Sequence, residues 1–203
     1  MKRILTSILL LLAAASLFAQ TVSEAVAKIN AANKVTSTVS FDVRTVRNTS
    51  MLSQPLISTG KVCVKAPSSL RYEGLTPAKS LFVLSDDRVL TESKGVRKST
   101  DLKEKNRYQA FMRSISRSST DGIVSEKDFA IECLSSGREL TLKLKPLGRD
   151  LSRMFTEITV RADADSGVIR EVLLRDIEGD TTSISISNVV MGAALPDNTF
   201  NTK

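Results

Sequence analysis

Few residues of this chain have the types and spacing that catalysis or metal binding requires. The 203-residue sequence has no His, which excludes imidazole general bases, Ser-His-Asp triads and most zinc sites. Asp163, Asp165 and Glu171 come closest to a calcium site, but their segment lacks the third oxygen ligand and the mid-loop Gly of an EF-hand. No glycine-rich phosphate loop and no G-x-S-x-G motif occurs. We therefore expect no metal, no cofactor and no enzymatic activity, and we interpret residues 165–167 as a hairpin turn.

The first 19 residues are typical of a secretory signal peptide. Two basic residues precede an apolar stretch from Ile4 to Leu12, and Ala19 offers a small residue for cleavage before Gln20. The stretch is too short to span a bilayer comfortably, and the alternatives are a buried N-terminal helix or an uncleaved anchor. Residues 20–203 are then expected to form a single periplasmic domain without an N-terminal lipid anchor.

The two cysteines, Cys63 and Cys133, lie in segments that alternate between apolar and polar residues. Cys63 shares its face with Lys61 and Lys65, whereas Cys133 lies on an apolar face. A disulfide needs Cβ atoms that point toward each other, so opposite faces argue against one. An exported protein enters an oxidising compartment, so a disulfide remains an alternative. We expect two half-buried free thiols.

Alternation of apolar and polar residues dominates the rest of the chain. Ten short segments, with turn signals about every ten residues, predict a largely antiparallel sheet that is apolar on one face. The segments are residues 39–43, 61–66, 70–73, 80–84, 89–91, 129–133, 140–145, 157–161, 168–174 and 183–187.

Two amphipathic helices are expected beside this sheet. The first carries an apolar stripe that starts at Val22, is capped by Thr21 or Ser23, and ends within residues 30–33. The second lies between residues 105 and 118. Two short helices can cover only part of the apolar face of a sheet with so many strands. Either the sheet closes on itself, or part of its apolar face remains available for a ligand.

Positive charge is concentrated in residues 94–117. This segment has a net charge of +6, whereas the rest of residues 20–203 sums to −1. It could dock an acidic partner or anionic lipid headgroups, or it could be a solvated helix face. The residues assigned to docking are Lys98, Lys105, Arg107, Arg113 and Arg117. Nucleic acid is not expected as a partner, because aromatic residues make up only 4% of the chain.

A characteristic order of turns runs through the chain. A strand that begins at Gly60 leads to a Pro turn and an Arg71-Tyr72 pair, followed by Thr76-Pro77 and a turn at residues 84–87. The C-terminal half adds the turn of residues 165–169 and the ending Leu195-Pro196-Asp197-Asn198-Thr199-Phe200. Over nearly all of residues 20–203, this order resembles the LolA-type periplasmic lipoprotein carrier family.

The resemblance implies a mainly β (α+β) fold. The expected architecture is an incomplete, strongly curved antiparallel β-barrel of about 10–11 strands, covered by short helices. The sequence departs from the family at Ala66, where a basic residue is frequent, at Tyr72, which replaces Trp, and at Asp87, which replaces a turn Gly. With so few aromatic residues, a cavity here would be mostly aliphatic.

The resemblance also implies a function and partners. Members of the family are periplasmic chaperones that take lipoproteins from an inner-membrane transporter and deliver them to an outer-membrane acceptor. By that resemblance we expect a monomer that holds acyl chains of a lipoprotein or related lipid. The residues predicted to line its cavity are Val39, Phe41, Val43, Val62, Val64, Leu70, Tyr72, Phe111, Met112, Ile115, Leu140, Leu142, Leu144, Ile158 and Val160. The alternative for any one of them is ordinary packed core.

Two other functions stay open at this point. The same sheet could serve a periplasmic regulatory or scaffold module that binds a membrane-protein partner through the basic segment. An enzyme is disfavoured, because no catalytic motif was found.

Overall fold

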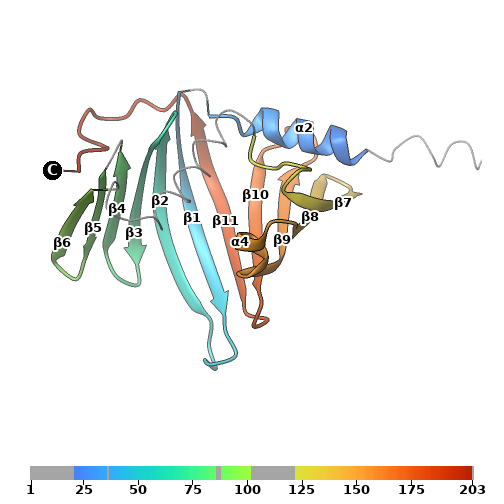
Figure 1. Cartoon of the computed structure of the whole chain (residues 1–203). Helices are drawn as coiled ribbons and strands as arrows, with labels where there is room; N and C mark the ends of the chain where they lie inside the picture. Colours follow the sequence, from blue (N-terminus) through green and yellow to red (C-terminus); the bar gives the residue numbers. More distant parts are fainter. Residues whose placement is uncertain (1–20, 36, 86–87, 102–121, 203) are drawn as a thin grey trace, which may run out of the picture.

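The computed structural model describes residues 21–35, 37–85, 88–101 and 122–202. These residues form one antiparallel sheet of eleven strands in the order β6-β5-β4-β3-β2-β1-β11-β10-β9-β8-β7 (Figure 1). The strands are β1 (Thr38–Asn48), β2 (Leu56–Lys65), β3 (Ser69–Thr76), β4 (Ser80–Ser85), β5 (Arg88–Ser93), β6 (Val96–Asp101), β7 (Phe129–Ser136), β8 (Glu139–Pro146), β9 (Phe155–Asp163), β10 (Ile169–Asp176) and β11 (Thr181–Met191). The sheet is curved and stays open between β6 and β7, so the expectation of an incomplete barrel is confirmed.

The strand registers place the predicted apolar positions on one face. Phe41 of β1 lies opposite Val62 of β2, and Val62 lies opposite Tyr72 of β3. On the other half of the sheet, Val160 of β9 lies opposite Leu142 of β8. Because paired residues point to the same side of a sheet, these rows form one continuous surface. We call it the inner face.

Helix α2 (Val22–Ala32) covers one end of the inner face. Thr21 caps it with a reciprocal capping box, in which the Thr21 hydroxyl accepts from the Glu24 N–H and the Glu24 carboxylate accepts from the Thr21 N–H. The helix ends at Ala32 with Asn33 as its C-cap, within the predicted range of residues 30–33. It buries Ala25, Val26 and Ile29 against strands β8, β9 and β10 (Figure 1).

The C-terminal tail lies on the opposite, outer face. Cys63, Arg71, Val83, Leu90 and Ser99 form a row across β2 to β6 on this face. Arg71 donates to the Thr199 carbonyl at 3.3 Å, and Ser99 donates to the Thr202 carbonyl at 3.1 Å. The tail thus crosses the row, which accounts for the full burial of Val83 and Leu90 on a face that is otherwise polar.

Two elements were not predicted from the sequence, strand β6 and the single-turn helix α4 (Arg149–Ser152). Both are too polar to show a clear apolar period. The predicted signal peptide of residues 1–19 and the predicted helix of residues 105–118 lie outside the described residues.

The two cysteines are free, in agreement with the face assignment. Cys63 lies on the outer face of β2, and Cys133 on the inner face of β7, opposite Leu142. Five other strands separate β2 from β7 in the sheet.

Candidate functional site

An apolar cavity of about 200 Å³ opens on the inner face at the centre of the sheet. One polar side chain, Asn33, contributes to its lining. The lining residues are Asn33, Val35, Val39, Phe41, Val64, Leu70, Ile123, Ile169, Ile186, Val189 and Met191. They come from β1, β2, β3, β10, β11 and the segments that follow α2 and precede β7. Among the residues that the structure describes, the lining contains no titratable group, so the cavity suits a neutral hydrocarbon.

Four of the predicted lining residues lie in this cavity: Val39, Phe41, Val64 and Leu70. Val64 is paired with Val39 on one side and with Leu70 on the other, so these three form a row across β1, β2 and β3. Phe41 adds the aromatic part of the wall. The strand alternation therefore brings this part of the predicted set together.

The predicted residues from the other half of the sheet lie elsewhere. Leu140, Leu142, Leu144 and Val160 are buried together beneath α2, with Ile158 packed against them. In this structure they form the core between helix and sheet rather than the wall of the cavity.

Val43, Val62 and Tyr72 continue the inner face beyond the cavity. Val43 and Val62 are buried, and the Tyr72 ring lies over Gly60 and Gly74. A Cβ atom on Gly60 would approach the ring to 2.7 Å, so this close packing requires Gly. Tyr72 thus packs against the backbone of two strands next to the cavity.

Some lining residues were missed because strand alternation breaks in β11. At a bulge between Ser40 and Asp42 of β1, two residues of β11, Asn188 and Val189, lie opposite Phe41 alone, and Asn188 has a φ of 53°. The Asn188 side chain donates to the Asp42 carboxylate at 2.7 Å. Beyond the bulge Val190 lies opposite Ser40 and faces outward, while Met191 lies opposite Val39 and faces the cavity. Strict alternation from the inward-facing Ile186 would have placed Val190 on the inner face and Met191 on the outer face.

Polar side chains of α2 and of its C-cap residue Asn33 contact the turn between β9 and β10. The Asn33 amide donates to the Gly167 carbonyl at 2.8 Å, and its oxygen accepts from the Ile169 N–H at 3.1 Å. Lys28 donates to the Ala164 carbonyl. These bonds fix the end of α2 to the turn between β9 and β10, which is the hairpin turn predicted at residues 165–167.

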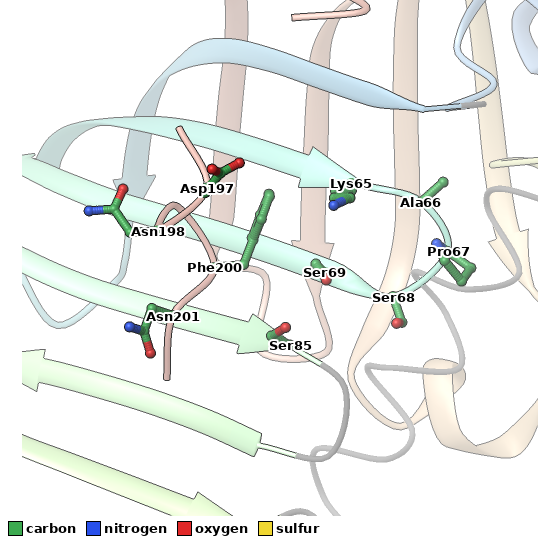
Figure 2. A pocket seen from close by; sticks show the side chains of 10 residues that line it. All are labelled: Lys65, Ala66, Pro67, Ser68, Ser69, Ser85, Asp197, Asn198, Phe200 and Asn201. Atoms are coloured by element: carbon green, nitrogen blue, oxygen red, sulfur yellow. The ribbon is translucent and has the colours of Figure 1, made fainter. Parts of the chain in front are cut away.

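A larger hollow of about 620 Å³ lies on the outer face, between the C-terminal tail and the turn from β2 to β3 (Figure 2). Its lining is mostly polar and includes Lys65, Ser69, Asp197 and Asn198 beside Phe200. The described residues of this lining include one cation, Lys65, and one carboxylate, Asp197.

The predicted docking residues are mostly outside the described part of the chain. Lys98 is exposed on β6, whereas Lys105, Arg107, Arg113 and Arg117 fall in residues that the structure does not describe, as do Phe111, Met112 and Ile115. The described residues contain no cluster of three or more His, Cys, Asp or Glu side chains placed to hold a metal ion. None of the described helices has the length and apolar character needed to cross a membrane.

Known structures share this architecture at low sequence identity. An uncharacterised conserved protein from Thermus thermophilus superposes with a TM-score of 0.55 at 9% identity, covering 89% of this chain and 93% of that one. The MucA/MucB complex of Pseudomonas aeruginosa gives a TM-score of 0.52 at 14% identity, with 89% of this chain and 60% of that chain covered. A LolA-superfamily protein from Nitrosomonas europaea gives 0.49 at 10% identity, with 90% and 98% covered.

A search of curated proteins gave no significant match. The profile of the family described as outer membrane lipoprotein carrier protein LolA matches residues 18–203. This match spans every described strand and both described helices, and it shows that the chain belongs to the LolA family.

Proposed function

We propose that this protein binds the acyl chains of lipoproteins, or of a related lipid, and carries them through the periplasm from the inner to the outer membrane. The observation that supports this proposal is the apolar cavity on the inner face of an open sheet. Membership of the lipoprotein carrier family points to the same class of ligand.

The physical need for a carrier is large. An acyl chain of about 16 carbons exposes roughly 15 methylenes, and at about 0.8 kcal/mol each the transfer into water costs roughly 12 kcal/mol. Several such chains on one lipoprotein make unassisted crossing negligible. A carrier needs only a dry apolar surface with a lower affinity than its destination, and no covalent chemistry.

The cavity in this state is smaller than the roughly 300–1,000 Å³ of typical ligand sites. Binding of a whole chain therefore requires the inner face to open further. Two lining residues, Val35 and Ile123, come from segments outside the sheet, and the Asn30 side chain of α2 donates to the carbonyl of Val124, next to Ile123. We propose that these two segments move to admit the ligand.

Two adjacent valines of β11 provide a matched test. Val189 lines the cavity, whereas Val190 faces outward with 51% of its surface exposed. A Val189→Trp substitution should fill the cavity and weaken binding of a fluorescent fatty acyl probe by about tenfold or more, and Val190→Trp should leave binding unchanged. Mass spectrometry of a lipid extract from protein purified without detergent should find acyl lipids. A lipid-free preparation with no probe uptake would reject the proposal.

A second candidate is a regulatory or scaffold module that binds a membrane-protein partner. Its support is the basic segment of residues 94–117 together with the MucA/MucB complex among the structural relatives. Reversal of charge at Arg107, Arg113 and Arg117 should then abolish pull-down of the partner. If pull-down is unchanged, that contact is rejected. In either role we expect a periplasmic monomer, with an inner-membrane transporter and an outer-membrane acceptor as partners of the carrier.

A further inference from the structure

Exposed large hydrophobic side chains gather at one end of the sheet. The described part of the chain has fourteen such side chains, and ten of them lie at the end where β1 turns into β2. We call these ten residues the apolar rim. They are Met51, Leu52, Leu56, Ile57, Leu75, Val96, Leu147, Leu151, Met154 and Ile177. Met51 is 87% exposed and Val96 71% exposed.

The strand pairing shows that these residues share one end. In an antiparallel sheet alternate connections lie at the same end, which here are the connections β1–β2, β3–β4, β5–β6, β8–β9 and β10–β11. The β1–β2 loop contacts the β10–β11 turn directly, because the Ser50 N–H donates to the Asp180 carboxylate at 3.0 Å. Figure 1 shows these two tips projecting at the end of the sheet that faces away from α2.

Basic residues accompany the rim. Arg47 lies 3.9 Å from the buried Asp180 and balances its charge. Apart from this pair, the five connections contain four basic residues and two acidic ones. They are Lys79, Lys94, Arg149 and Arg153, and Asp150 and Glu178. The rim thus combines projecting apolar side chains with a small excess of positive charge, the pattern of surfaces that bind the interface of anionic membranes.

We propose that the apolar rim binds the surface of a lipid bilayer that contains anionic lipids. Six of its side chains come from the β1–β2, β8–β9 and β10–β11 connections, four come from the ends of β2, β3 and β6, and Met51 and Leu52 lie in a loop. A bilayer accepts such dispersed side chains because it has no fixed shape. The neighbouring Lys and Arg side chains reach the headgroup phosphates. This contact lies at the opposite end from α2, so it does not use the cavity.

The test compares two double variants of the full mature chain in vesicle co-sedimentation. Met51→Ser with Leu52→Ser alters the rim, and Leu134→Ser with Val190→Ser alters two exposed apolar residues that lie elsewhere. Vesicles made of equal parts phosphatidylethanolamine and phosphatidylglycerol should bind the unmodified protein. The rim variant should lose about tenfold or more of its partition coefficient, and the control variant should keep it.

Three outcomes would overturn the proposal: no binding of the unmodified protein to these vesicles, full binding of the rim variant, or equal loss in both variants. Binding of the fluorescent acyl probe is measured on the same samples. The rim variant should retain it, so failure of the rim proposal and failure of the cavity proposal can be told apart.

Discussion

Asn30 of α2 holds Val124 through both of its backbone groups. The Asn30 amide donates to the Val124 carbonyl at 2.7 Å, and its oxygen accepts from the Val124 N–H at 2.9 Å. Val124 is fully buried, and the neighbouring Ile123 lines the cavity. One side chain therefore anchors the segment that enters β7 to the helix.

Loss of this anchor should destabilise the fold. Asn30→Ala removes two hydrogen bonds and leaves two backbone groups without partners, so the free energy of unfolding should fall by about 2 kcal/mol. Asn48→Ala is the control, because its exposed side chain makes one long bond of 3.4 Å to Thr181. Urea unfolding of both variants checks the prediction, and equal stabilities would contradict it.

A second pair of variants tests how closely α2 packs on the turn between β9 and β10. Gly167 has a φ of +74°, and an added Cβ would lie 2.9 Å from the Lys28 carbonyl. Gly179 has a similar φ of +88°, with nothing within 4 Å of an added Cβ. Gly179→Ala should cost about 1 kcal/mol of backbone strain, and Gly167→Ala about 1–3 kcal/mol more. Thermal unfolding gives both values, and similar losses would mean that the helix is not packed this tightly.

A carboxylate on the outer face should make stability depend on pH. The Ser183 hydroxyl and the Arg161 guanidinium both donate to Glu171 and hold the pKa of that carboxyl below its ordinary value near 4.5. Since the folded-state pKa is the lower one, this contribution is present above pH 4.5 and is lost as the pH falls through the folded value. Glu171→Gln should therefore reduce the acid-induced loss of stability.

Chemical unfolding across this pH range measures the effect. Ser183→Ala removes the largest cause of the shift and should act in the same direction. Glu126→Gln, in the exposed turn before β7, is the control. An identical acid response for Glu171→Gln and the unmodified protein would refute the assignment.

The C-terminal tail should protect Cys63 from modification. Cys63 is only 8% exposed, and its burial raises the pKa of its thiol. Its neighbour Arg71 is bonded to the tail at Thr199. Truncation after Asp197 should raise the rate of Cys63 alkylation by about tenfold or more, while Cys133 on the other face keeps its rate. An unchanged Cys63 rate would show that the tail does not protect it.

Much of the sheet could be predicted because a half-buried strand alternates with a period of two. Val39 and Val64 were assigned to the inner face for this reason, and the register pairs them there. Alternation fails at a bulge, so counting in twos along β11 from Ile186 could not predict that Met191 faces inward.

Other parts of the site depend on contacts between distant segments. Leu142 and Val64 follow the same strand pattern, but α2 packs on the first and leaves the second beside a cavity. Ile123 and Val35 contribute from connecting segments without any period. The burial of Leu90 depends on the C-terminal tail, whose path no local pattern specifies.

The central claim is that an acyl chain binds on the inner face, at the cavity. A fatty acid with a photoreactive diazirine near the end of its chain tests this most directly, with the labelled residues mapped by mass spectrometry. Labels should fall on Phe41, Val64 and the lining residues Ile186, Val189 and Met191 of β11, and Val189→Trp should remove them. Labels on the outer face around Phe200, or a distribution that Val189→Trp leaves unchanged, would contradict the account.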